Sequence, residues 1–333
     1  MARRDKNTYK PFHWIPGQGP DTKALKRMRQ QAGRPKKAMG EDWFLCSEDE
    51  RVVYNSLLDK GVADHSLEEL EEILMSIASG LKCFGHADNW EDWCAYILPE
   101  LIPRAFEYRS DYLIEYLVTA IMVVMPDASK PVYYGSFKED ALATLGQAIM
   151  APERWPHGPE SAWCLHDHWE APTGYPVWGN ASGDLSASIF FCLKYLATDD
   201  VRGWVKSVFD IPCPRWRGQI LVWLCGTKYL IDGKISQPSE LDMDNDLYRS
   251  TQWSNGYTID GSIVSYSEKY PKSPQPIPFL SRANRQAFDN CVQNLLSEDL
   301  LSEWLKSMRP FPSLYNHITQ TNVPDEVRQN YNL

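Results

Sequence analysis

The sequence of 333 residues lacks the local patterns that would identify an enzymatic activity at once. Its eight cysteines form no C-x-x-C pair and follow no regular spacing, which argues against a disulfide framework and against a zinc finger. It contains no Walker-type glycine loop, no G-x-G-x-x-G fingerprint, no G-x-S-x-G elbow and no H-E-x-x-H helix. We therefore expect neither a cofactor nor a metal, and the motifs give no support to a catalytic function.

Long apolar runs are also lacking. The longest, Tyr116 to Met125, is about half of the roughly 20 residues that a membrane-spanning helix needs. The basic stretch Met1 to Lys10 is followed by polar residues and prolines, where a secretory signal would continue with an apolar stretch. We therefore expect a protein without membrane spans that is kept in the reducing cytoplasm.

Charge is distributed very unevenly along the chain, whose net charge is −10. Residues 1–40 carry 11 Lys and Arg against Asp5 and Asp21, a net of +9, which leaves −19 for residues 41–333. This asymmetry predicts a basic, partly disordered arm (1–40) joined to an acidic body (41–333). The body should repel phosphates, whereas the arm has three possible targets: nucleic acid, an acidic protein surface or the chain's own body.

Helix-start signals recur along the chain. A Ser followed three residues later by Glu can form a capping box, in which each side chain bonds the backbone N–H of the other residue. Three such pairs precede apolar periodic segments: Ser47 with Glu50, Ser66 with Glu69, and Ser136 with Glu139. We expect helices to begin at these residues.

Apolar residues follow the helical period in many segments. Stripes with steps of three and four residues include Leu70, Ile73 and Leu74; Val201, Trp204, Val205 and Val208; Phe288, Cys291 and Val292; and Leu301, Trp304 and Met308. Residues 111–125 and 216–230 are apolar almost all round, which is typical of helices packed on several sides. The sequence therefore predicts an all-α body of about nine to twelve helices.

Two segments resemble helices of HEAT-type repeats. Residues 96–103, with Pro99 and Pro103 among leucines and isoleucines, resemble the first helix of such a repeat, and residues 138–146 resemble the second. The resemblance covers about 60 residues and implies an α-solenoid with a concave binding surface and usually no catalysis. Because no period of about 40 residues can be phased over the remainder, a non-repetitive multi-helix bundle stays open as the alternative.

Residues 151–188 form the first irregular insertion, rich in tryptophan, histidine, proline and glycine. Cys164, His166 and His168 stand at alternate positions and could converge on a metal ion from an extended backbone. Structural zinc sites mostly separate their ligands by two to five residues, however, and no second ligand pair follows. We therefore interpret this insertion as a loop anchored by its tryptophans, and an enzyme with a site here is only the third hypothesis for function.

Residues 233–280 form the second insertion. Asp260-Gly261, flanked by two β-branched segments, predicts a small β-hairpin that protrudes from the helical body. Aromatic residues nearby suit a partner-binding surface, because Tyr and Trp are enriched at interface hot spots. These candidates are Tyr248, Trp253, Tyr257 and Tyr266. The alternative is that their rings pin the insertion to the body.

The basic arm contains Gly33-Arg34-Pro35 followed by Lys36 and Lys37, which resembles the core of an AT-hook. That resemblance implies that Arg34, Lys36 and Lys37 bind a narrow A·T minor groove, although Ala32 stands where the usual arginine precedes the glycine. Residues 21–31 before it predict a short basic helix capped by Asp21, either displaying its cations outward or docked on the acidic body.

These observations favour a non-enzymatic protein that binds another macromolecule, most readily a protein. A cytosolic adaptor, an inhibitor or immunity-type protein, and a subunit of a larger complex all fit this description. The alternative is a nucleic-acid-associated helical protein that makes its contacts through the arm.

Overall fold

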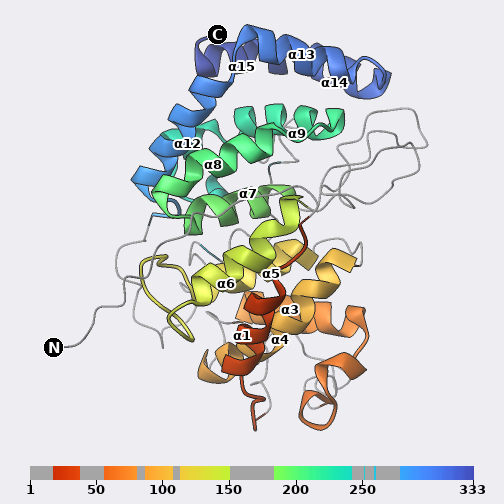
Figure 1. The fold of residues 1–333 in the computed structure, drawn as a ribbon, viewed down its shortest axis with the longest axis vertical. Coiled ribbons are helices and arrows are strands. Elements are labelled where there is room, and N and C mark those ends of the chain that lie inside the picture. The colour runs from red at the N-terminus through yellow and green to blue at the C-terminus, as the bar shows by residue number, and fades with distance from the viewer. Residues whose placement is uncertain are drawn as a thin grey trace, which may run out of the picture.

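The structure is a computed structural model that describes residues 18–37, 56–80, 87–107, 113–150, 184–241, 251, 259 and 278–333. Every regular element within these residues is an α-helix or a 3-10 helix (Figure 1), which confirms the predicted all-α class. None of the helices described is both long and apolar enough to cross a bilayer.

The helices fall into an N-terminal and a C-terminal group. The first group consists of α1 (Thr22–Gln31), α3 (Leu67–Gly80), α4 (Ala87–Glu107), α5 (Leu113–Val124) and α6 (Phe137–Thr144), with the 3-10 helices η1 (Val62–Asp64) and η2 (Leu145–Met150). The second consists of α7 (Asp184–Tyr195), α8 (Thr198–Phe209), α9 (Pro214–Gly226), α10 (Lys228–Asp232), η4 (Pro238–Glu240), α12 (Arg282–Leu295), α13 (Glu298–Met308), α14 (Pro312–Gln320) and α15 (Val323–Tyr331).

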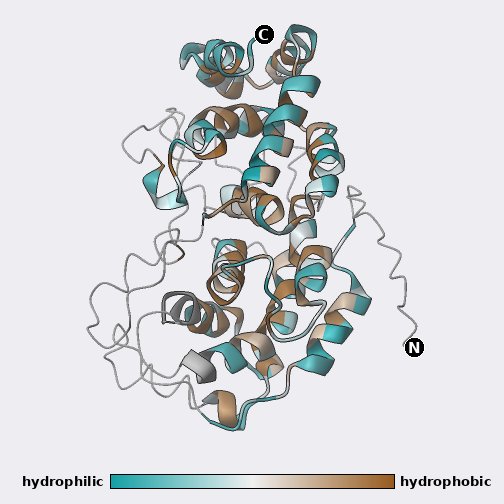
Figure 2. Cartoon of the chain, turned by 90° about the vertical axis from the view of Figure 1, so that its left-hand side faces the viewer, coloured by the Kyte–Doolittle hydropathy of each residue, from teal (hydrophilic) through white to brown (hydrophobic). Residues whose placement is uncertain are grey.

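These helices are stacked along the long axis of the molecule (Figure 1). Helix α5 packs against both α3 and α7 and so joins the two groups. The hydroxyl of Tyr195 at the end of α7 donates a hydrogen bond of 2.7 Å to the carbonyl of Met125, just past the end of α5. One buried apolar cluster extends from Leu25 in α1 to Tyr331 in α15, and Figure 2 shows polar residues on the outward faces of the helices.

The capping predictions have mixed outcomes. Ser66 and Glu69 form the reciprocal box at the start of α3, with N–H to side-chain distances of 2.7 Å and 3.2 Å. Ser136 stands at the start of α6, but its side chain makes no capping hydrogen bond, so that prediction of a box is wrong although the helix is present. The pair Ser47 and Glu50 lies outside the described residues.

The apolar stripes are buried as the helical period requires. Leu70, Ile73 and Leu74 in α3 are fully buried, and the stripes of α8, α12 and α13 also face the core. Helix α5 is buried almost all round. The apolar segment 216–230 is split between α9 and α10, because α9 ends at Gly226 and Thr227 turns its hydroxyl back onto the Trp223 carbonyl.

The two predicted insertions are described only in part. Residues 184–188 belong to α7, and η4 lies inside the range 233–280. The predicted hairpin lies outside the described residues except for Ile259, which is buried and is helical where the prediction places a strand. Helix α4 continues through Pro99 and Pro103.

Partial burial of His317 in α14 predicts a pH dependence of stability. It lowers the pKa of this imidazole from 6.5 to about 4, because the charged form is desolvated. The folded state therefore binds a proton at His317 less well than the unfolded state does. The contribution of the neutral imidazole to the free energy of unfolding is complete above pH 6.5 and is lost as pH falls towards 4.

Urea titrations at pH 7.5 and pH 5.0 test the role of His317. Between these two pH values, we expect the wild type to lose more stability than His317→Gln. Equal losses would show that His317 does not contribute.

Candidate binding site beside the N-terminal helix

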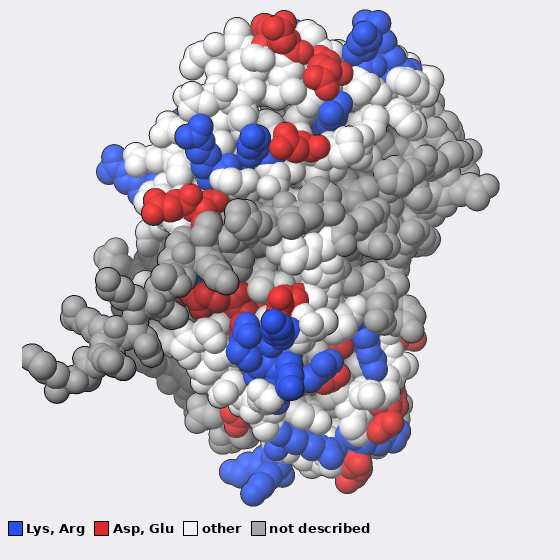
Figure 3. Space-filling model, in the orientation of Figure 1, with Lys and Arg blue, Asp and Glu red and all other residues white. Residues whose placement is uncertain are grey.

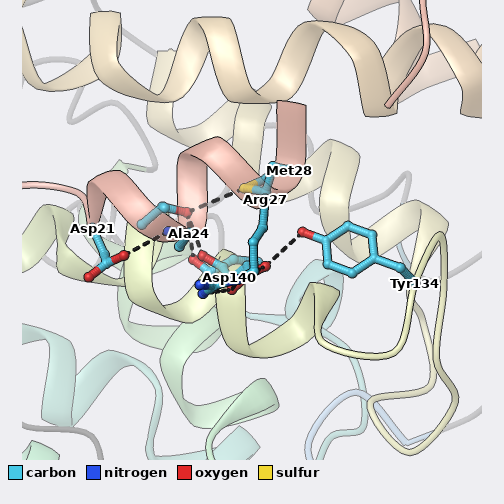
Figure 4. Close-up of polar contacts among 8 residues, drawn as sticks. Asp21, Ala24, Arg27, Met28, Tyr134 and Asp140 are labelled. Atoms are coloured by element: carbon cyan, nitrogen blue, oxygen red, sulfur yellow. Dashed lines mark hydrogen bonds and ion pairs between the residues drawn. The ribbon is translucent and has the colours of Figure 1, made fainter. Parts of the chain in front are cut away.

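Helix α1 belongs to the basic arm by composition and docks on the body by its apolar face. Ala24, Leu25 and Met28 are buried, and the helix packs against α4 and α6. Asp21 caps it through a hydrogen bond of 2.7 Å from the Ala24 N–H, as the sequence predicts (Figure 4). The helix is therefore docked, while its two lysines, Lys23 and Lys26, remain exposed.

A buried carboxylate fixes α1 onto α6. The Asp140 side chain is only 2% exposed and forms an ion pair with Arg27, whose Nε lies 3.1 Å from both of its oxygens. The Tyr134 hydroxyl donates a further hydrogen bond of 2.9 Å to the same carboxylate (Figure 4). The hydrogen bond to Asp140 is the largest cause that raises the pKa of Arg27. The pKa of Tyr134 is raised most by burial and next by its own hydrogen bond to Asp140. Both donors therefore keep their protons in neutral solution.

Further side-chain contacts continue this attachment along the arm. Arg29 forms an exposed ion pair of 2.6 Å with Glu100 in α4. Arg34 donates two hydrogen bonds from Nη2, of 2.6 Å to the Leu57 carbonyl and 2.7 Å to the Lys60 carbonyl. The Trp93 indole donates 2.7 Å to the carbonyl of Lys37.

Four lysines of this segment remain available to a partner. Lys23, Lys26, Lys36 and Lys37 are exposed, and none forms an ion pair with another described residue. In Figure 3, Lys and Arg side chains gather over α1. Of the predicted nucleic-acid-binding residues, the lysines are thus displayed, whereas Arg34 is engaged within the chain.

A pocket of about 290 Å³ opens at the C-terminal end of α1, between this helix, α4 and the loop before α6. Six of the residues around it are Met28, Gln31, Asp92, Tyr133, Tyr134 and Phe137. The rings of Tyr133 and Tyr134 both meet Phe137 edge to face, with centroid distances of 4.9 Å and 5.7 Å. Phe137 is buried and Tyr133 is 38% exposed, so the aromatic wall extends from the core to the surface.

Tyr133 is held in an unusual backbone conformation. Its φ is 54°, and the Tyr134 N–H bonds the Val132 carbonyl, which makes a three-residue γ-turn centred on Tyr133. Its hydroxyl donates 3.0 Å to the Glu91 carbonyl in α4. The backbone of a residue that carries a β-carbon is strained at positive φ, and such strained residues concentrate at functional sites. Sequence reasoning missed Tyr133, although the turn-forming residues Pro131 and Gly135 around it were a visible signal.

The strain at Tyr133 can be measured with two substitutions. Both Tyr133→Ala and Tyr133→Gly remove the ring and its hydrogen bond, but only alanine retains a β-carbon at positive φ. We therefore expect Tyr133→Gly to be more stable than Tyr133→Ala by about 1 kcal/mol. At most positions the alanine variant is instead the more stable of the two. Urea unfolding of both variants tests this. If the alanine variant is the more stable, the conformation is not strained.

The described cysteines give no support to a nucleophilic role. The thiols of Cys94, Cys192, Cys213, Cys225 and Cys291 are all buried. Burial raises the pKa of Cys94, whose side chain contacts that of Tyr133, to about 12, so its thiol stays protonated. The described residues contain no group of three or more His, Cys, Asp or Glu able to hold a metal ion.

Several predicted residues lie outside the described part of the chain. These are Cys164, His166 and His168 and the four aromatic candidates Tyr248, Trp253, Tyr257 and Tyr266. Comparison of the chain with protein-family models, with curated proteins and with solved structures finds no match. The case for function therefore rests on the pocket and on the basic surface beside it.

Proposed function

We propose that this chain is a non-enzymatic protein that binds another protein through the surface at the end of α1. The observation that carries the proposal is the pocket wall formed by Tyr133. This residue is 38% exposed, has a positive φ and packs edge to face against the buried ring of Phe137. Rigid aromatic side chains that are held in place supply binding energy at a low entropic cost, which is why Tyr is enriched at interface hot spots.

The stacked helical architecture agrees with such a role. A HEAT-like stack or an irregular bundle would hold the surface rigidly, so that little ordering is needed on binding. A cytoplasmic adaptor, an inhibitor or immunity-type protein, or a complex subunit remains the class that we propose. Arg34 supports a protein partner over DNA, because an AT-hook contact would first have to break its bonds to Leu57 and Lys60.

Site-specific photocrosslinking tests this proposal. We would place p-benzoylphenylalanine at position 133 and, as a matched control, at position 229, because Tyr229 is 62% exposed and does not line the pocket. In the native host cell, we expect a discrete protease-sensitive adduct from position 133 and none from position 229. The absence of any adduct at position 133, or the same adduct from both positions, would contradict the proposal.

Nucleic acid is the second candidate partner, favoured by the four exposed lysines of residues 23–37. If it is the partner, Lys23→Gln with Lys26→Gln should weaken duplex binding and reduce the log–log salt slope by about 0.9 for each phosphate that is no longer neutralised. Arg34→Ala should lower stability and leave any A·T preference unchanged, because Arg34 binds backbone carbonyls of its own chain. Fluorescence anisotropy across a salt series measures DNA binding by both variants.

A further inference from the structure

We infer that the pocket beside Tyr133 takes an arginine side chain of the protein partner. The inference rests on the proposed function and specifies which chemical group the partner inserts. It is carried by the charge and the shape of the pocket, which together select a flat cation.

The described residues that line the pocket carry a negative charge, although the neighbouring helix is basic. Among the described residues that line the pocket, Asp92 is the only charged one, and it is exposed. The last turn of α1, which supplies Met28 and Gln31, also ends at the pocket. The carbonyl end of a helix carries about half a negative charge and favours cations.

The positive charges of α1 are directed elsewhere or paired. Lys23 and Lys26 lie on the face of the helix opposite Met28, because these positions are more than a quarter-turn away from it at 100° per residue. Arg27 and Arg29 are each paired with a carboxylate, Asp140 and Glu100. None of these four cations is among the described residues that line the pocket.

The aromatic wall explains why arginine fits better than lysine. A guanidinium is planar, stacks on an aromatic face and can bond a carboxylate with two parallel N–H groups. Tyr133, which lines the pocket and is 38% exposed as a residue, would offer such a face, and Asp92 would supply the carboxylate. A pocket of about 290 Å³ is at the lower end of the range for small-molecule sites, and suits one side chain.

Fluorine NMR of the full chain labelled with 3-fluorotyrosine tests this inference. The Tyr133 resonance is assigned as the signal that disappears in Tyr133→Phe, and the probes are N-acetylarginine amide, N-acetyllysine amide and the neutral isostere N-acetylcitrulline amide. We expect saturable shifts of this resonance with the arginine probe, weaker shifts with lysine and none with citrulline. Asp92→Asn should weaken arginine binding up to about fivefold, whereas Asp59→Asn, an exposed carboxylate that does not line the pocket, should have no effect.

Equal shifts with citrulline, or no shift of Tyr133 with any probe, would overturn the arginine assignment. Circular dichroism of Asp92→Asn confirms that a loss of binding is not a loss of fold. Failure of the proposed function has a different signature. If only the proposed function is wrong, the arginine probe binds but position 133 yields no protein adduct. If only the arginine assignment is wrong, position 133 yields a protein adduct but the arginine probe does not bind.

Discussion

Leu74→Asp is expected to destabilise the protein by about 4 kcal/mol or more, which is a large fraction of the stability of a typical domain. Leu74 is fully buried in α3, so a carboxylate at this position would point into the apolar cluster that the described residues form. Helix α3 packs against α4 and α5, and α5 in turn contacts α7, so the damage should reach both helix groups. Thermal unfolding followed by far-ultraviolet circular dichroism measures the effect.

Two further variants separate burial from helix propensity. Leu74→Ala removes the side chain without introducing a charge and should cost about 2–5 kcal/mol. Glu72→Asp tests aspartate on the exposed face of the same helix, and it should cost only about 0.5 kcal/mol. A Leu74→Asp variant as stable as Glu72→Asp would contradict the packing described for α3.

The second large effect is expected from Asp140→Ala, which should destabilise the docked α1 by about 3 kcal/mol. The substitution leaves Arg27 and the Tyr134 hydroxyl without the carboxylate that both now bind. Limited trypsin digestion with mass spectrometry should then show faster cleavage after Lys23 and Lys26, since a released α1 no longer protects its backbone.

Glu100→Ala is the matched control, because it removes the other carboxylate that holds an arginine of α1. The side chains of Arg29 and Glu100 are 46% and 34% exposed, whereas those of Arg27 and Asp140 are 49% and 2% exposed, so the two pairs differ in the burial of the carboxylate. Exposed pairs contribute about 1 kcal/mol or less. If Asp140→Ala and Glu100→Ala have equal effects, α1 is held by its apolar face and not by the buried carboxylate.

The helices could be predicted because their stability follows from patterns within one segment. The stripe of Leu70, Ile73 and Leu74 must face a core, whichever helix completes that core. A capping box is harder to predict from the sequence than a helix is, since Ser66 forms its box and Ser136 does not. The same three-residue spacing is present in both cases, but the chain enters α6 from the tight turns around Tyr133 and Tyr134.

The candidate site could not be predicted, because its parts come from separate segments. Gln31, Asp92 and Tyr133 lie on α1, on α4 and in a loop, and only the packing of those elements brings them together. Arg34 illustrates the same limit. Its neighbours in sequence suggest DNA, whereas its partners in the fold are the carbonyls of Leu57 and Lys60.

The most direct test of the central claim is to identify what the photoreactive residue at position 133 captures. Tandem mass spectrometry of the purified adduct reads both the chemical class of the partner and the peptide that is attached. The account predicts a protein adduct whose crosslinked peptide contains an arginine, and the yield of this adduct should fall by up to about fivefold when Asp92→Asn is combined with the photoreactive residue. Capture of nucleic acid, or of a peptide without arginine that is insensitive to Asp92→Asn, would contradict it.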